Sequence, residues 1–147
     1  MTEPAAPESC HRLARCYSAL TRGLFYPGSE GDSPFLPFAC AYEGTRVTLD
    51  TFLPHLHLAS FWEVDIRDGD AWLKQVIANY TADGDAEIVA AYTDLRKVMR
   101  ATLSGKVSLV HAAAKPGLPT FHKARVFLVG TAHPSGIAGL MSYSVET

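Results

Sequence analysis

The sequence lacks the features that mark several large classes of protein. Its 147 residues contain no apolar run near the roughly 20 residues needed to cross a membrane. No basic start followed by an apolar stretch indicates a secretory signal. Lys and Arg number 13 against 15 Asp and Glu, so the basic excess typical of nucleic-acid binders is missing. We therefore expect a cytoplasmic protein that binds neither a membrane nor nucleic acid directly.

Metal-binding and disulfide patterns are missing as well. Cys10, Cys16 and Cys40 form no C-x-x-C pair and have no zinc-finger spacing. Without a secretory signal, free reduced thiols are the preferred interpretation. His55 and His57 would share one face of a strand and could chelate a metal, but a partly exposed pair is the simpler interpretation. We expect no cofactor and no metal site belonging to this chain.

The common signatures of enzymes are absent too. The sequence has no P-loop, no dinucleotide-binding fingerprint and no G-x-S-x-G nucleophile elbow. Ser135 and His133 invite comparison with a catalytic triad, but a Ser beside a Pro in a turn is usually structural. We therefore expect no enzymatic activity. A small hydrolase that uses Ser135 and His133 is the alternative, and it requires those two side chains to meet.

The composition that is present suits one folded domain. Hydrophobic residues make up 48% of the chain and charged residues 19%, enough to build a packed core. Residues 1–8 are rich in Pro, Ala and Glu and read as a disordered N-terminal segment, which leaves 9–147 as the domain. Apolar residues at three- and four-residue steps then predict a helix that Ser9 caps and Gly23 ends.

Periodicity predicts the remaining elements. Alternation predicts a strand at 35–42, where Pro37 indicates a sheet edge, and a hairpin partner around 47–49, whereas 52–69 gives no clear assignment. Two helices follow: one capped by Asp70, with a stripe of Trp72, Leu73, Val76, Ile77 and Tyr80, and one with Ile88, Tyr92, Leu95, Met99 and Leu103. Strands are predicted at 107–113, 126–129 and 137–145. This order predicts a single-domain α+β fold with a mostly antiparallel sheet covered by helices.

Two segments together resemble a known family. The C-terminal run has an apolar strand ending in Gly130, a Pro-containing turn, an apolar-Ala-Gly-apolar stretch and a final Val-Glu-Thr. It resembles the end of the nuclease A inhibitor family, and the segment 24–44 resembles that family's first helix exit, acidic loop and first strand. The helix around Tyr92 follows the family's spacing. The resemblance covers most of the chain in order and is weakest at 45–79.

The resemblance implies an α/β/α sandwich and a function. Members of this family inhibit a metal-dependent, sugar-nonspecific DNA/RNA endonuclease by occupying its active site. Carried over position by position, Thr147 would approach the Mg²⁺ of the partner, Glu30 would pair with a nuclease arginine, and Tyr80 would pack on the nuclease where the family has Trp. Glu146 also matches the terminal motif. The implied partner is the endonuclease, and the chain is expected to be a monomer before it forms the complex.

The implied chemistry is sensible for these residue types. A nuclease active site holds a phosphate with a divalent cation and an arginine, and carboxylates can imitate that anion. A C-terminal carboxylate is ionised at neutral pH and offers hard oxygen donors to Mg²⁺, while Glu30 can accept a bidentate guanidinium. Each residue also has a plainer interpretation: Thr147 as a solvated end, Glu30 as a surface charge, and Tyr80 as part of a helix stripe. The alternative function is a non-catalytic interaction module of the same fold with a different partner.

This chain also departs from the family pattern. Two residues near Pro27 and Gly28 read as an insertion, extra residues lie between Leu49 and Tyr80, and Tyr80 offers a smaller contact than Trp. Such contacts at the rim of an interface set specificity. The departures therefore bear on which nuclease is the target.

Overall fold

The chain folds into helices packed on one antiparallel sheet. The computed structural model describes residues 6–27, 33–48, 52, 62–114, 123–132 and 136–145. The elements are, in order, α1 (Glu8–Leu20), β1 (Leu36–Ala41), β2 (Trp62–Asp68), α3 (Gly69–Ala82), α4 (Ala86–Thr102), β3 (Ser108–Ala114), β4 (Lys123–Ala132) and β5 (Gly136–Val145). The strands form a five-stranded sheet in the order β1-β5-β4-β3-β2, with every neighbouring pair antiparallel. The predicted α+β class is confirmed.

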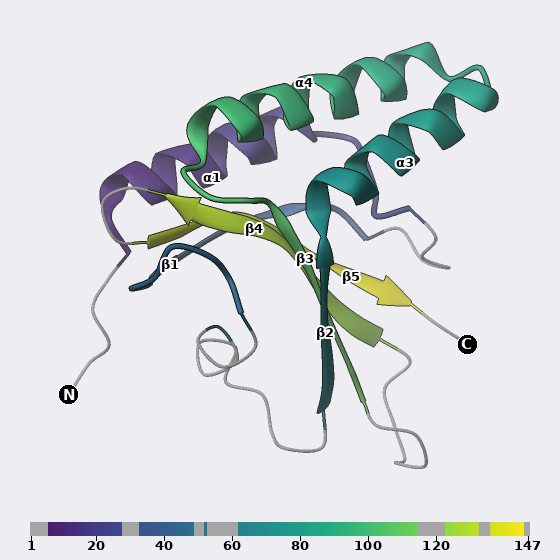
Figure 1. Ribbon diagram of the computed structural model, residues 1–147. Helices are drawn as coiled ribbons and strands as arrows, with labels where there is room; N and C mark the ends of the chain where they lie inside the picture. Colours follow the sequence, from purple (N-terminus) through teal and green to yellow (C-terminus); the bar gives the residue numbers. More distant parts are fainter. Residues whose placement is uncertain are drawn as a thin grey trace.

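The helices α1, α3 and α4 lie together on one face of the sheet (Figure 1). The opposite face is covered differently in the described part of the chain: Tyr42, Val47 and Phe52 pack there against the sheet. The described residues therefore show one layer made by these three helices. The second helical layer implied by an α/β/α sandwich does not come from α1, α3 or α4.

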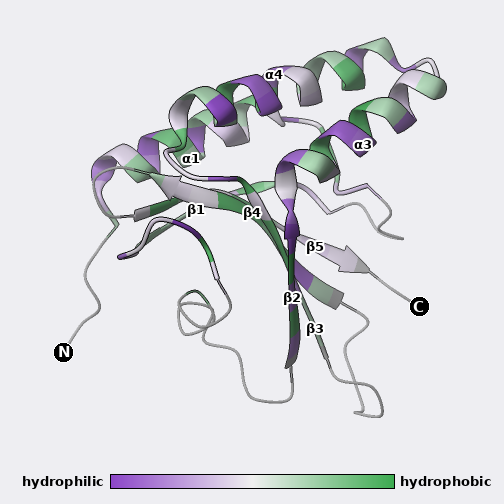
Figure 2. Cartoon of the chain, viewed as in Figure 1, coloured by the Kyte–Doolittle hydropathy of each residue, from purple (hydrophilic) through white to green (hydrophobic). Residues whose placement is uncertain are grey.

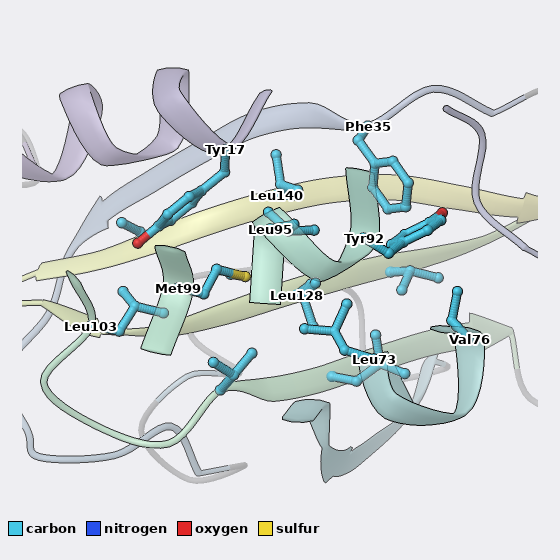
Figure 3. Packing of buried hydrophobic residues seen from close by; sticks show 14 of the residues in the cluster. Tyr17, Phe35, Leu73, Val76, Tyr92, Leu95, Met99, Leu103, Leu128 and Leu140 are labelled. Atoms are coloured by element: carbon cyan, nitrogen blue, oxygen red, sulfur yellow. The ribbon is translucent and has the colours of Figure 1, made fainter. Parts of the chain in front are cut away.

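Alternation along the strands divides the buried residues between two hydrophobic cores. On β4, Val126 and Leu128 belong to the core beneath the helices, whereas Phe127 and Val129 belong to the core on the opposite face. Apolar helix residues belong to the first core, and Figure 2 shows apolar and polar positions mixed along each helix. In Figure 3 the first core is seen from close by. Its labelled members are Tyr17, Phe35, Leu73, Val76, Tyr92, Leu95, Met99, Leu103, Leu128 and Leu140.

The helical stripes are as predicted, but both predicted caps are wrong. The N-cap of α1 is Pro7 rather than Ser9, so the helix starts at Glu8, one residue inside the segment expected to be disordered. The N-cap of α3 is Asp68 rather than Asp70: the Asp68 carboxylate accepts a hydrogen bond from the Ala71 N–H at 3.1 Å. The reason is that β2 runs directly into α3, so the cap falls on the last strand residue.

The predicted edge position of the strand containing Pro37 is confirmed, but its predicted hairpin partner is wrong. Strand β1 lies at the edge of the sheet, as Pro37 indicates, since proline cannot donate a hydrogen bond to a second neighbour. Its partner, however, is β5 and not 47–49. The chain bends at 44–46, where Gly44 has a φ of +153°, and Val47 is buried in the core on the opposite face.

Strand β2 was missed in the region that gave no clear assignment. Its outward positions carry Glu63, Asp65 and Arg67, whereas Val64 and Ile66 face the core opposite the helices. The alternation was therefore present in the sequence. Among the acidic residues it was too weak to give an assignment, and the pairing with β3 decides the outcome because it satisfies the backbone of β2 on one side.

Candidate partner-binding surface

A short stem holds the segment in which Glu30 lies. Phe25 and Pro34 form an isolated antiparallel bridge, and the Tyr26 N–H donates to the Ser33 carbonyl at 2.9 Å. We call these four residues the loop stem: Phe25, Tyr26, Ser33 and Pro34. Glu30 itself lies outside the described residues, as do Glu146 and Thr147. The geometry of the site therefore comes from the described residues that flank these three positions in the sequence.

The loop stem is fixed to β5 by a buried hydroxyl. The hydroxyl of Ser142, which is 1% exposed, lies 3.1 and 3.0 Å from the carbonyl oxygens of Ser33 and Pro34, which share its single proton as acceptors. The pairing of β1 with β5 starts next to this contact, because Leu36 lies opposite Met141. Ser142 lies three residues before the last described residue of β5. The loop stem and the C-terminal end of β5 therefore belong to one end of the sheet (Figure 1).

Aromatic side chains attach the same stem to the helix layer. The Tyr26 ring stacks on Trp72 of α3 with a centroid distance of 5.7 Å and meets Phe35 edge-on at 6.4 Å. Phe35 in turn meets Tyr92 of α4 edge-on at 6.3 Å, and Figure 3 shows these two rings side by side. The Tyr92 hydroxyl donates to the Phe25 carbonyl at 3.3 Å. Burial, with smaller effects of Tyr80 and Tyr26, raises the pKa of Tyr92, so this donor stays protonated at neutral pH.

Tyr80 lies in this aromatic group. It is half-buried near the C-terminal end of α3, and its ring stacks on that of Tyr92 at 5.9 Å with an interplanar angle of 13°. The helix stripe and a partner contact are both compatible with this position, because one side of the ring packs inward while the residue keeps some exposure. Tyr80 thus packs on Tyr92, whose hydroxyl bonds to Phe25 of the loop stem.

The segments that meet here carry few positive charges. No Lys or Arg occurs in 23–45, 75–95 or 126–147, whereas each segment holds at least one acidic residue, in the last case Glu146 alone. After Tyr80, Asp83 and Asp85 between α3 and α4 are exposed, as is Glu87 in the first turn of α4. Strand β4 does place Lys123 and Arg125 opposite Val145 and Tyr143, so the end of the sheet is not uniformly acidic. The prevailing sign suits a partner whose binding site is basic or holds a cation.

A contact surface with apolar walls and a polar wall formed by Ser18, Thr21 and Arg22 adjoins the loop stem. Phe25 keeps 46% of its surface exposed, and it lines a pocket of about 210 Å³ between the end of α1 and the start of β1. Leu24, Pro34 and Phe35 supply most of the other apolar wall. The sequence analysis did not single out Phe25. The only sequence signal was an aromatic residue placed directly before a loop rich in Gly and Pro.

Comparisons with known proteins identify no family. No family model matches the chain, and no curated protein matches it either. The resemblance to the nuclease A inhibitor family therefore stays a prediction from the sequence.

Other candidate sites find no support in the described part of the chain. Its His, Cys, Asp and Glu side chains form no group of three or more able to hold a metal ion, and none of its helices has the length and apolar character to cross a membrane. Cys10 is buried, Cys40 is half-buried and Cys16 is exposed, and none of the three forms a disulfide. The pair His55 and His57 lies outside the described residues.

The alternative hydrolase site consists of His133 and Ser135, between β4 and β5 in the sequence. Both His133 and Ser135 lie outside the described residues, in the connection between β4 and β5. This connection joins Ala132 to Gly136, which pair with each other across the sheet. Ala132 and Gly136 lie at the opposite end of the β4–β5 pair from Ser142, which pairs with Val126.

Proposed function

We propose that the protein inhibits a metal-dependent, sugar-nonspecific endonuclease by occupying its active site. The observation that carries the proposal is the convergence of three segments at one end of the sheet: the loop stem, the C-terminal end of β5, and the aromatic group that contains Tyr80. These are the segments on which the resemblance places partner contacts. Ser142 and Tyr92 join them through hydrogen bonds to the loop stem.

In this proposal the chain mimics one bound phosphate. Glu30 accepts a bidentate guanidinium pair from the nuclease, and the final residues Glu146 and Thr147 present oxygen donors to its Mg²⁺. Tyr80 adds an aromatic contact beside them. Strand β5, which precedes the terminal residues, pairs with β4 as far as Val145, whereas β1 pairs with it only as far as Met141. Order in the strand before a binding segment reduces the entropy lost on binding.

The direct test measures inhibition of a purified endonuclease of this class by the wild-type chain and by Glu30→Ala. We expect the wild type to inhibit at stoichiometric concentration and Glu30→Ala to weaken binding by about 2–5 kcal/mol, because a desolvated arginine loses its partner. The matched control is Glu43→Ala, which removes an exposed glutamate just after β1, at the other end of the sheet. Its inhibition should equal that of the wild type.

A second experiment tests the proposed role of the terminal residues. Residues appended after Thr147 should reduce inhibition, whereas the same tag placed before Met1 should not. Full inhibition by the C-terminally extended protein would rule out the role of Thr147. A wild-type chain without effect on such nucleases would instead favour the alternative, an interaction module of this fold that binds another protein.

A further inference from the structure

Two buried serines, Ser142 and Ser144, follow the apolar residues that β5 presents to the helices. Ala138 and Leu140 point into the core beneath the helices and are fully buried, and the next residue on that face is Ser142, at 1% exposure. Burying a hydroxyl costs free energy unless it is hydrogen-bonded. An apolar residue would serve the packing of β5 at least as well. The Ser142 hydroxyl is therefore best explained by what it binds.

What Ser142 binds lies more than one hundred residues away in the chain. Its hydroxyl is directed at two consecutive carbonyls of the loop stem, those of Ser33 and Pro34. The Ser33 carbonyl also accepts the Tyr26 N–H, so it joins both limbs of the stem to β5. One side chain thus holds the loop stem and the strand that leads to Glu146 and Thr147.

We propose that Ser142 is a positioning residue for partner binding: it fixes the loop stem, whose residues flank Glu30 in the sequence, on β5, the strand that precedes Glu146 and Thr147. This inference rests on the proposed inhibitor function. Without the Ser142 hydroxyl the stem keeps its Tyr26–Ser33 bond and the pairing of Leu36 with Met141 next to it, but it loses the hydrogen bonding of Ser142 to its carbonyls. Binding then has to order the stem, which weakens the complex.

The first test compares Ser142→Ala with Ser142→Thr, which restores a hydroxyl at the same carbon. We expect the dissociation constant for the purified endonuclease to rise about tenfold in Ser142→Ala, the effect of losing one buried hydrogen bond, and to return toward the wild-type value in Ser142→Thr. The matched control is Thr131→Val. Thr131 is also a buried strand hydroxyl that donates to a loop carbonyl, that of Thr45 at 3.1 Å, at the opposite end of the β4–β5 hairpin.

The control separates positioning from general loss of stability. Thr131→Val should lower the unfolding midpoint much as Ser142→Ala does, yet leave the dissociation constant within about twofold of the wild type. Equal weakening of binding by both variants would overturn the proposal. So would wild-type affinity in Ser142→Ala.

A double-mutant cycle with Glu30→Ala then asks whether Ser142 acts through the loop. If it does, Ser142→Ala should have little further effect on affinity in the Glu30→Ala background. Residues that act independently instead give additive losses. Additive losses in the cycle would contradict the proposal.

Hydrogen exchange keeps this inference distinct from the proposed function. The Tyr26 amide donates to the carbonyl that Ser142 holds, so its exchange should be about tenfold faster in Ser142→Ala and unchanged in Thr131→Val. This readout needs no partner. If the wild type inhibits no nuclease, the proposed function fails, and unchanged exchange at Tyr26 would separately overturn the positioning role.

Discussion

At the scale of single residues, an ion pair joins the start of α3 to α4. The Arg96 guanidinium donates to both carboxylate oxygens of Asp70, at 2.8 and 3.3 Å, and both side chains are half-buried. The sequence analysis gave Asp70 the role of a helix cap. Its partner was not predictable, because Arg96 lies 26 residues away and only the packing of α3 on α4 brings the two side chains together.

This pair predicts a pH dependence of stability. The hydrogen bond from Arg96, helped by the nearby Lys74 and Arg100 charges, lowers the pKa of Asp70 below its ordinary 3.8. A lowered folded-state pKa stabilises the protein above the unfolded-state value, and that contribution is lost as the pH falls through the folded-state pKa. Urea unfolding between pH 6 and pH 2 should therefore show a smaller acid-dependent loss in Asp70→Asn than in the wild type.

The control for this measurement is Asp65→Asn. Asp65 pairs with Arg67 at 2.8 Å, but both side chains are exposed, and exposed pairs contribute little. The profile of Asp65→Asn should follow that of the wild type. An Asp70→Asn profile that also follows it would refute the stabilising role of the Arg96 pair.

At the scale of elements, the helix starts show how local chemistry and chain path combine. Asp68 and Asp85 are both N-cap residues and both aspartates, yet only Asp68 makes a side-chain hydrogen bond to the helix it precedes. The difference lies in the backbone before each helix. Asp68 leaves an extended strand with a ψ of 111°, whereas Asp85 follows the tight turn at Gly84, where φ is +76°.

The two caps give a matched pair of substitutions. Asp68→Ala should lower the free energy of unfolding by about 1 kcal/mol, because the Ala71 N–H loses its acceptor. Asp85→Ala should cost less, because it removes only a negative charge near a helix start, an effect of a few tenths of a kcal/mol. Guanidinium unfolding of both variants measures this. A cost for Asp85→Ala that equals or exceeds that for Asp68→Ala would contradict the assignment of the caps.

At the scale of the whole molecule, the sheet separates two hydrophobic cores that are covered by different parts of the chain. Helices cover one face, and their stripes were predictable because each repeats every three or four residues. On the other face, Phe52 is 1% exposed and meets Phe38 and Phe127 edge-on at 6.2 and 5.9 Å. The sequence gives no periodicity around Phe52, so this core could not be predicted.

The second core can be tested with one pair of phenylalanines. Phe52→Ala should destabilise the fold by about 3–5 kcal/mol, the usual cost of emptying a buried aromatic site. Phe25→Ala removes an aromatic ring that is 46% exposed and should cost much less. Thermal unfolding of both variants reports the difference. Comparable losses in the two would show that Phe52 does not belong to a packed core.

In the candidate surface, too, positions set by local spacing were predictable and contacts between distant segments were not. Tyr80 could be identified from the sequence, since both the helix stripe and the family resemblance include it. The contacts of Ser142 could not, because no local pattern joins a residue of the last strand to carbonyls at positions 33 and 34. The same holds for Tyr92, which the stripe predicts to be buried but whose hydroxyl finds its acceptor 67 residues earlier.

The sequence by itself determined the α+β class, the faces of the helices, the edge position of the strand containing Pro37, and the buried central strand. Each of these follows from local spacing and from what a single residue type allows. Only the tertiary structure decided which strands pair, which carboxylate caps a helix and which binds Arg96, and how the loop stem is fixed to β5. These outcomes depend on contacts between distant segments, whose geometry is set when the two cores pack on the sheet.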